Sequence, residues 1–392
     1  MFKKLWKKFV TSLFRQQNKR LDSMQAQLER QQKLLEQQQK LLTTQQRLLK
    51  EQGKAVEENR EYLRRELKRR DLWSIKAAEA RRLAAGRPIW VIKCPAPDNK
   101  DKILWGEYNF ALALQKELTK LGIYVVVQWY EDWYSEFPAD VVVVLRGGYR
   151  YRPDRRNANC KYILWLSCFT EKVTKEEFES YDLVLVASRP YAKELKQQLS
   201  VPVEPLLLCV DTERFFPQET EKEYDNVFVG NTRYVKRTCV DWCEKHDIPL
   251  KLWGRTEGKA GWKVFIKQES CVELMGGVRN EDLPELYRKS WIILNDHFED
   301  MRQKGFLNNR VLEGLCCGRP VLSDYCEEYE ELLGDSVVFY RDEQDFLEKL
   351  KLLEQSDFYT QQMEKVQAAW PLLQQEYSFE ARTRQLVELA KQ

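Results

Sequence analysis

Histidine, paired cysteines and long apolar runs are scarce in this sequence of 392 residues. It has two histidines, and none of its ten cysteines forms a Cys-x-x-Cys pair, so the spacing typical of a structural zinc site or a redox dithiol is absent. We interpret the cysteines as reduced thiols of a cytosolic protein. No stretch contains the roughly 20 apolar residues of a membrane-spanning helix, and lysines interrupt every candidate for a signal-peptide core. We therefore expect neither a spanning helix nor a cleaved signal peptide.

Basic residues are concentrated at the start of the chain. Residues 1–86 hold 22 Lys/Arg and 10 Asp/Glu, a net charge of +12, so the other residues carry −9 of the total of +3. Seven apolar residues recur at helical spacing in the first twenty positions: Phe2, Leu5, Trp6, Phe9, Val10, Leu13 and Phe14. We expect residues 1–20 to form an amphipathic helix in the interface of a membrane with acidic lipids. The alternative is that this helix packs on the rest of the protein or on its copies.

A repeat of seven residues follows in residues 21–86. Its apolar positions are Leu21, Leu28, Leu35, Leu42, Leu49, Val56 and Leu63. This period predicts a left-handed coiled coil and hence a homo-oligomer, although the positions that should complete the seam are largely glutamine. A single solvated helical spacer is the alternative. We expect Gly53 to interrupt the helix and Gly86-Arg87-Pro88 to end it. The aromatic residues before the repeat lie on one helical face and form no stacking platform, so we expect no nucleic-acid partner.

From residue 87 the pattern changes to apolar, β-branched runs that alternate with helical segments. In residues 87–210 the runs are IWVIKC, IYVVVQW, ADVVVVLR, KYILWLS and DLVLVAS, and in residues 211–377 they are NVFVGN, LKLWG, WIILND, PVLSD and SVVFY. Alternation of this kind is typical of a parallel sheet covered by helices on both faces. The sequence therefore predicts an α/β protein with two Rossmann-like domains facing a cleft, preceded by the amphipathic helix and the coiled coil.

Residues 291–325 read as strand, glycine-bearing loop, helix and second strand, an order that suits a nucleotide-diphosphate site. A helix N-terminus offers unpaired N–H groups and positive dipole to a phosphate. We expect Glu313, about two turns inside this helix, to accept hydrogen bonds from ribose hydroxyls. Gly305 would let the backbone approach the ligand closely. Asn308, Asn309 and Arg310 would donate to phosphate or sugar; for Arg310, an internal ion pair is equally compatible with the sequence.

Other candidates follow strands, because ligands of open parallel sheets bind beyond the carboxyl ends of the strands. Arg233 lies in the sequence Gly230-Asn231-Thr-Arg after the run NVFVG, and Arg237 is about one turn later. A guanidinium there could clamp a diphosphate and stabilise its charge as the sugar bond breaks; a surface arginine at a helix start is the alternative. His297 follows WIILND and is either a donor-site residue or a structural histidine.

These motifs together resemble the C-terminal half of bacterial GT-B glycosyltransferases, specifically the group labelled CgeB-like, with a C-terminal domain of the glycosyl transferases group 1 type. The resemblance is carried by FVGNTR, LNDHF, GFLNNR and LEGLCCGRPVLSD, and upstream by WGEYNFALAL, ADVVVVLRGGYRY, YDLVLVAS and LCVDTERFFP. It covers most of the chain after Pro88. It implies a nucleotide-sugar donor held by the residues named above and by Phe306, with His297 and Glu313 as catalytic residues. It also implies retention of anomeric configuration, and that residues 378–392 cross back onto the first domain.

The sequence departs from the family at two places. Many retaining members carry a glutamate eight positions before the one matched by Glu313, and here that position is Gly305; Glu299 and Asp300 are nearby but lack the spacing. The family's Ser-His-Pro-Asp element after the fourth strand is replaced by LSCFTEKV, which leaves Glu171 as a substitute for an acceptor-activating base. We expect neither metal nor cofactor, because arginines and a helix dipole can balance the phosphate charge.

The acceptor side is expected in the first domain. Trp105 and Gly106 form a glycine-bearing turn, and Arg146 is followed by a loop that includes Tyr149 and Tyr151. Sugars stack on aromatic rings, so these residues are candidate acceptor contacts; packing in the core or at its rim is equally compatible.

We thus expect a glycosyltransferase of cell-surface polysaccharide biosynthesis. It would be cytoplasmic, peripheral on the inner face of the cell membrane, and would transfer a sugar to a glycan or lipid-linked acceptor. A non-catalytic scaffold on a membrane-bound coiled coil and a nucleotide-sugar epimerase or hydrolase are the alternatives.

Overall fold

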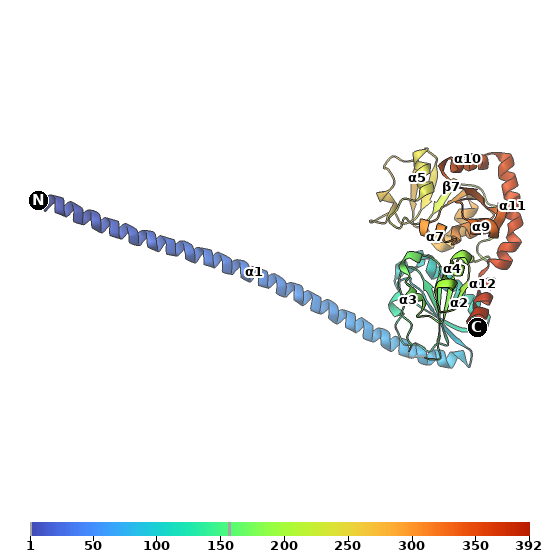
Figure 1. The fold of residues 1–392 in the computed structure, drawn as a ribbon, viewed down its shortest axis with the longest axis horizontal. Helices are drawn as coiled ribbons and strands as arrows, with labels where there is room; N and C mark the ends of the chain where they lie inside the picture. Colours follow the sequence, from blue (N-terminus) through green and yellow to red (C-terminus); the bar gives the residue numbers. More distant parts are fainter. Residues whose placement is uncertain (1, 156–157) are drawn as a thin grey trace. The chain divides into compact units, whose positions relative to one another are not determined.

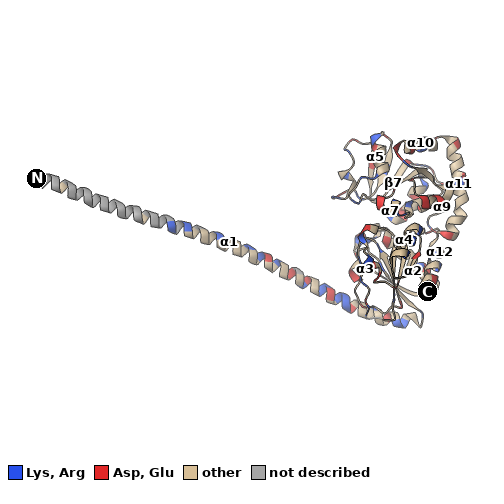
Figure 2. Ribbon diagram, in the orientation of Figure 1, with Lys and Arg blue, Asp and Glu red and all other residues tan. Residues whose placement is uncertain are grey.

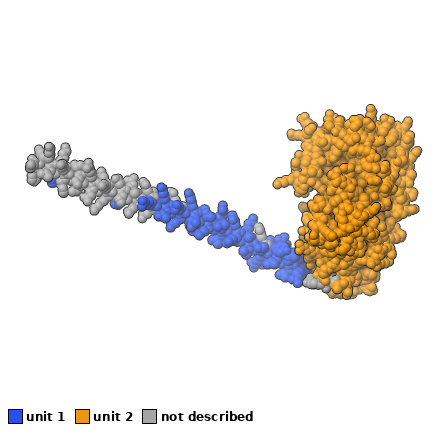
Figure 3. All heavy atoms as spheres, viewed as in Figure 1, with its two compact units in different colours: residues 1–72 blue, residues 73–392 orange. Residues whose placement is uncertain are grey.

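The computed structural model describes residues 2–155 and 158–392, leaving aside most side chains before residue 33 and those of residues 36 and 58. It divides into two compact units, residues 1–72 and residues 73–392 (Figure 3).

The first unit is part of one long helix, α1 (Phe2–Ala84) (Figure 1). The helix runs through Gly53, where we expected an interruption; a glycine costs a helix only about 1 kcal/mol, and strong helix formers flank it. Charged residues of both signs are interspersed along the described part of α1 (Figure 2). The side chains of the amphipathic pattern in residues 1–20 lie outside the described residues, except that of Trp6, which is exposed. None of the described helices is long and apolar enough to cross a membrane.

The heptad positions of α1 are exposed wherever their side chains are described. Between 57% and 67% of each side chain is accessible at Leu35, Leu42, Leu49, Val56 and Leu63. An apolar row of this kind has no partner within the described part of its own unit, so the coiled coil and the oligomer remain predictions.

The end of α1 belongs to the second unit and packs on it. Trp73, Ala77, Ala80 and Ala84 are buried, and their spacing of three or four residues places them on one helical face. The Trp73 ring meets the ring of Phe137 edge to face, with centroids 5.6 Å apart. The last turns of the predicted spacer, from Trp73 on, are therefore a part of the first α/β domain.

The first domain is a parallel sheet of six strands in the order β2-β1-β3-β4-β5-β6. Its elements are β1 (Ile89–Lys93), α2 (Gly106–Lys120), β2 (Tyr124–Gln128), β3 (Val141–Arg146), β4 (Lys161–Leu166), α3 (Lys175–Phe178), β5 (Leu183–Val186), α4 (Arg189–Gln198) and β6 (Val203–Pro205). Successive side chains of a strand point to opposite faces, so the sheet carries two cores. Trp90 and Ile92 face α2, while Val91 faces the side that α4 covers.

The second domain is also a parallel sheet of six strands, in the order β12-β11-β10-β7-β8-β9. Its elements are β7 (Tyr224–Val229), α5 (Thr238–Lys245), β8 (Leu250–Trp253), β9 (Val272–Gly276), α6 (Leu283–Arg288), β10 (Ser290–Asn295), α7 (Glu299–Gln303), α8 (Asn309–Cys316), β11 (Val321–Asp324), α9 (Glu327–Leu333), β12 (Val338–Tyr340), α10 (Glu343–Leu353) and α11 (Ser356–Glu376). The predicted pair of parallel α/β domains is thus confirmed. We did not predict β6 and β9, whose sequences VEP and VELMG lack a β-branched apolar run.

The last helix, α12 (Phe379–Lys391), returns to the first domain and lies beside α2 (Figure 1). Phe379 and Leu386 are buried in the core on that face of the first sheet, and the Phe379 ring lies 4.8 Å from that of Phe110. Lys161 Nζ donates to the carbonyl of Ala390 at 2.9 Å. These contacts tie the end of the chain to the domain in which the first sheet lies.

Candidate functional site

The segment between β10 and α8, which includes α7, is the part of the chain for which we predicted phosphate binding. Helix α8 begins at Asn309, and Asn308 is its N-cap, with Oδ1 accepting from the N–H of Arg310 at 3.0 Å. One of the first N–H groups is therefore already paired inside the protein. Asn309 Oδ1 is buried without a hydrogen-bond partner among the described residues. Since buried amide oxygens are normally paired, a donor group of a ligand could supply the hydrogen bond that Asn309 Oδ1 lacks.

Glu313 is a partly exposed carboxylate on α8, four residues past the start of the helix. It is thus just over one turn inside, closer to the helix N-terminus than the two turns that we expected. Tyr287 donates its hydroxyl to Glu313 Oε2 at 3.4 Å. Burial raises the pKa of Glu313 to about 7, against the opposing charge of Arg310 and Arg214. A carboxylate of this kind has few partners of its own, so hydrogen bonds that it accepts from the hydroxyl groups of a ligand would contribute a large binding free energy.

Arg310 is buried and serves the interior of the domain. Its guanidinium donates to Asn295 Oδ1 and to the carbonyl of Val229, and lies 4.2 Å from the ring of Phe228. Burial lowers the pKa of Arg310. A Cβ on Gly230 would come within 2.4 Å of Arg310 Nη2, so glycine at that position makes room for the guanidinium. The structure places Arg310 as a link between α8 and strands β7 and β10.

Arg233 lies where the two α/β domains meet. Its guanidinium carbon is 3.8 Å from the ring centroid of Phe169 in the first domain and 4.2 Å from that of Phe298 in the second. Arg233 and Tyr234 both have positive φ, of 46° and 66°, a conformation that costs about 1–2 kcal/mol per non-glycine residue. Backbone strain of this size persists only where surrounding contacts fix it, and it is common at functional sites.

Arg237 is buried in the second domain, in contrast to Arg233. It forms an ion pair with Asp296, which follows β10, and its Nη1 donates to the carbonyl of Asn231 at 3.4 Å. The Asn231 side chain is exposed and accepts from the N–H of Arg255 at 2.9 Å. Arg237 therefore fixes the loop that carries Asn231 and Arg233.

His297 has both ring nitrogens occupied. Nδ1 lies 2.6 Å from Asp324 Oδ1, and Nε2 lies 2.8 Å from the hydroxyl of Tyr329, which in turn accepts from the N–H of Asn308. Burial alone would raise the pKa of Asp324, but the charge and hydrogen bonds of His297 hold it below its usual value. Asp324 is thus bonded to His297, and the N-cap of α9 (Glu327–Leu333) is Cys326. His297 is thus placed to position the start of α8.

Gly305 and Phe306 lie at the contact between the two domains. Gly305 has φ +68°, and a Cβ there would come within 2.6 Å of Pro190 at the start of α4. The close approach that we expected toward a ligand is made toward the first domain. Phe306 is fully buried in the same core as Tyr191, with ring centroids 5.9 Å apart. Asp300 accepts from Thr170 Oγ1 of the first domain at 3.2 Å.

The predicted acceptor residues divide into buried and accessible ones. Arg146 is buried in an ion pair with Glu177, with 2.7 Å between Nε and Oε1. Tyr149 is 42% exposed, and its ring lies 4.4 Å from that of Tyr130. Trp105 is the N-cap of α2 and is partly buried. Gly106, the first residue of α2, is exposed.

Glu107 and Phe169 are two residues of the domain junction that we did not predict. Glu107 Oε1 lies 3.1 Å from the position that a Cβ on Gly147 would take. Burial raises the pKa of Glu107, and the nearby charge of Arg233 opposes that shift. Glu107 directly follows the turn of Trp105 and Gly106, so its position was readable from the sequence. Phe169 lies in the loop after β4, where the sequence predicted only a substitute base, Glu171, and Glu171 is exposed.

The structure therefore brings Arg233, Glu107 and Phe169 together at the domain junction. Asn308, Asn309 and Glu313 form a second group at the start of α8. Arg146, Arg237, His297 and Arg310 are committed to internal bonds, and Phe306 to packing.

Residues 233–388 match the model of a family described as glycosyl transferase-like. No curated protein sequence matches this chain. The chain is similar in fold to a sucrose-phosphate synthase from Thermosynechococcus elongatus, at 11% identity and a TM-score of 0.57, over 78% of this chain and 98% of that one. It is also similar to Anabaena Alr3699/HepE, solved in complex with UDP and glucose, at 10% identity and a TM-score of 0.55, over 78% and 100%.

A third similar structure is T4 phage BGT in complex with its UDP-glucose substrate, at 13% identity and a TM-score of 0.54, over 77% of this chain and 98% of that one. At these identities the likeness shows the fold, which is the two-domain GT-B arrangement. The family match and the fold support a transferase enzyme of the glycosyltransferase class. The finer resemblance to the CgeB-like group stays a prediction.

Proposed function

We propose that this chain, which combines a GT-B fold with a glycosyl transferase-like segment, transfers a sugar from a nucleotide-sugar donor to a glycan or lipid-linked acceptor. The observation that carries the proposal is the loop and helix after β10. There a capped helix N-terminus, the unpaired Asn309 oxygen and the carboxylate of Glu313 follow one another within six residues. A nucleotide diphosphate presents the complementary groups in the same order. Its phosphate oxygens can accept from the helix N-terminus, and its ribose hydroxyls can donate to the Asn309 oxygen and to Glu313.

The donor diphosphate would lie between α8 and Arg233. Arg233 is partly exposed and makes ring contacts with Phe169 and Phe298, but no ion pair within 4 Å with a carboxylate of the described residues. Its charge is therefore available to a phosphate. Stabilisation of the departing diphosphate by a fixed cation is a large part of catalysis in phosphate chemistry. We propose that this cation makes a divalent metal unnecessary.

The acceptor would approach from the first domain, beside Glu107. The carboxylate of Glu107 is close enough to Arg233 for their charges to interact. An acceptor hydroxyl that is hydrogen-bonded to Glu107 would therefore lie near the donor phosphates. Tyr149 offers an exposed ring for stacking. We propose retention of configuration, following the family resemblance. Determination of the product anomer by NMR tests this, and an inverted product would instead assign Glu107 the role of general base.

We further propose that the protein is peripheral on the cytoplasmic face of a bacterial membrane, where it serves synthesis of cell-surface polysaccharide. The basic, amphipathic pattern of residues 1–20 supports this, as does the absence of acidic residues before Leu21. Homo-oligomerisation through the heptads of α1 would bring several such segments to one membrane and strengthen attachment.

The test of the donor site is thermal stabilisation of the full chain by UDP, GDP, CMP, ADP and dTDP, with and without EDTA. Uridine nucleotides come first, because two of the structures similar in fold were solved with UDP or UDP-glucose. A ligand at 100 times its Kd should add about 2.7 kcal/mol to the free energy of unfolding. We expect a base-selective shift that EDTA leaves unchanged and that Glu313→Ala and Arg233→Ala each reduce.

The matched control is Arg384→Ala, which removes an exposed arginine of α12 that pairs with Glu380. It should leave the nucleotide shift intact. If no nucleotide stabilises the chain, the enzyme proposal fails in favour of a non-catalytic scaffold, for which the loss of the family's first glutamate at Gly305 would be the reason. A donor consumed without any acceptor would instead indicate an epimerase or hydrolase.

A further inference from the structure

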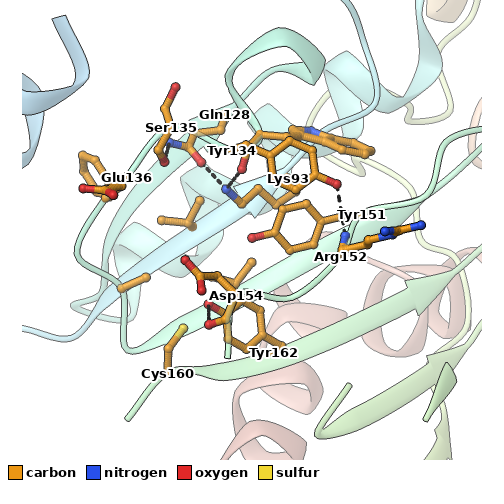
Figure 4. Close-up of a pocket in the computed structure, with 15 residues that line it drawn as sticks. Lys93, Gln128, Tyr134, Ser135, Glu136, Tyr151, Arg152, Asp154, Cys160 and Tyr162 are labelled. Carbon is orange, nitrogen blue, oxygen red and sulfur yellow. Dashed lines mark hydrogen bonds between the residues drawn. The ribbon is translucent and has the colours of Figure 1, made fainter. Parts of the chain in front are cut away.

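A cavity lies in the first domain, on the face of its sheet opposite α2. Its volume is about 700 Å³, which is within the range of small-molecule sites. Strands β1 to β4 supply its floor, and the loops after β2 and β3 supply its walls (Figure 4). Its polar and aromatic lining includes Lys93, Gln128, Tyr134, Glu136, Tyr151 and Tyr162. None of the residues assigned to the donor site lines it.

Lys93 is the most unusual residue of this lining, because it is a cation with only 4% of its surface exposed. Its Nζ donates to Gln128 Oε1 and to the carbonyl of Trp133, both neutral acceptors. No carboxylate of the described residues lies within 4 Å of it, although the more distant charge of Asp132 favours the ammonium. Burial lowers the pKa of Lys93 to about 7. A buried ammonium without a close counter-ion is costly, and an anionic ligand would supply that counter-ion.

The wall beside Lys93 is a row of tyrosine rings. Tyr134 stacks on Tyr151 at 5.3 Å with 19° between planes, and Tyr151 stacks on Tyr162 at 6.4 Å with 27°. Lys93 Nζ lies 4.9 Å from the centre of the Tyr151 ring. Tyr134 is largely exposed, so the row runs from the buried floor to the mouth of the cavity. Aromatic faces next to polar groups suit a ring that is apolar on its faces and polar at its rim.

The rim of the cavity is polar and carries both signs of charge. Glu136, Asp154 and Arg152 line it, with Cys160 deeper inside. The loop that carries Glu136 is held in place, since Gln128 Nε2 donates to the carbonyl of Ser135 at 3.3 Å and Phe137 packs on Trp73. Carboxylates at the rim accept hydrogen bonds from hydroxyl groups.

We propose that this cavity is a saccharide site for a sugar residue that carries a carboxylate. The carboxylate pairs with Lys93, the sugar ring stacks on the tyrosine row, and the rim carboxylates accept its hydroxyls. The site concerns binding alone and does not depend on sugar transfer. Within an enzyme that extends a glycan, it would hold an acidic residue of that glycan away from the reacting end.

The test uses the full chain and D-glucuronate as the probe, with D-glucose, acetate and inorganic phosphate beside it in ligand-observed NMR titrations. Glucose keeps the ring without the charge, and the two other anions keep a charge without the ring. We expect glucuronate to bind at least tenfold more tightly than each of the three. Calorimetry near pH 7.5 in two buffers of different ionisation enthalpy should show proton uptake on binding, because pairing raises the pKa of Lys93.

Lys93→Met keeps most of the buried stem and should weaken glucuronate binding at least tenfold. Tyr134→Ala removes an exposed stacking ring and should weaken binding severalfold, whereas Tyr134→Phe should not. Glu313→Ala should bind glucuronate as the wild type does, even if it has lost the nucleotide, which separates this site from the donor site.

Equal affinity for glucose and glucuronate would overturn the proposal. So would binding that is unchanged in a folded Lys93→Met variant. Phosphate binding as tight as that of glucuronate, insensitive to Tyr134→Ala, would reduce the cavity to a simple anion site and also reject the saccharide assignment.

Discussion

At the scale of the residue, burial decides what each charged side chain does. Arg146, Arg237 and Arg310 were all predicted to meet ligands, and each is buried and bonded inside its domain. Arg233 is partly exposed and turns to the domain junction. A buried guanidinium must have its donors paired, and these three are paired by carbonyl, amide or carboxylate groups of the protein itself. Substitution of these three should therefore affect stability before it affects binding.

The carboxyl of Glu313 should make stability depend on pH. Its pKa of about 7 in the folded protein lies above the ordinary 4.5, so folding favours the neutral form. Its contribution is fully present below pH 4.5, declines as the pH rises, and is lost above pH 7. The shift corresponds to about 3 kcal/mol. Urea unfolding at pH 5 and pH 8 should show that the wild type loses most of this amount relative to Glu313→Gln.

Glu313→Gln is the matched control, because the amide keeps the shape of the side chain and cannot ionise. If the free energies of unfolding of the two proteins changed with pH in parallel, the carboxyl of Glu313 would be well solvated, contrary to its position in the structure.

At the scale of the element, the segment from α7 to α8 has two roles. Gly305 and Phe306 bind the first domain through Pro190 and Tyr191, and the next residues begin the helix that carries Glu313. A chain of hydrogen bonds runs from Asp324 through His297 and Tyr329 to the N–H of Asn308. A change in the contact between the domains would therefore move the start of α8 directly.

Gly305→Ala should test this connection. It puts a methyl group 2.6 Å from Pro190 and forces a residue with a side chain to adopt φ +68°. Gly276→Ala is the control, since Gly276 has φ +87° and open space around its Cβ position. We expect a loss of about 1 kcal/mol for Gly276→Ala from the backbone alone, and about 2–4 kcal/mol for Gly305→Ala, measured by urea unfolding. If both variants lost the same stability, Pro190 would move away from the added methyl group at no cost in free energy.

At the scale of the whole molecule, the chain joins a compact two-domain unit to a helix that has an uncovered apolar row. Helical stability in water comes largely from packing of an apolar face, and a long single helix with exposed leucines lacks it. The heptad spacing offers the same face of another copy as the partner.

Leu42→Asp combined with Leu49→Asp should convert the oligomer to a monomer. Both substitutions put a charge into the predicted seam, where it would be desolvated without a partner. Thr43→Asp, which lies about 100° around the helix from Leu42 and outside the heptad row, is the control and should leave the oligomer intact. Mass from light scattering or sedimentation measures the outcome, and nucleotide stabilisation should be unchanged in all three proteins. A monomeric wild type would reject the coiled coil and favour the solvated spacer.

The sequence by itself determined the architecture, because hydrophobic periodicity is a local property that each segment carries independently. The strand runs after residue 87 predicted two parallel sheets, and the order of motifs from Trp291 to Tyr325 predicted a loop followed by a helix, which the structure shows as α8 (Asn309–Cys316). Gly53 was misread, since one glycine does not stop a helix with good neighbours on both sides.

Only the tertiary structure decided which polar residues are free to bind, because that depends on partners distant in the sequence. Arg310 is hydrogen-bonded to Asn295, Arg146 to Glu177, and His297 to Asp324 and Tyr329. Residue type and position after a strand were therefore not sufficient to assign these side chains to a ligand. The same long-range packing brought Glu107 and Phe169 to Arg233 and buried Lys93 beside a row of tyrosines. Burial and pairing are properties of the folded chain, and they separate the side chains that bind from those that hold the fold.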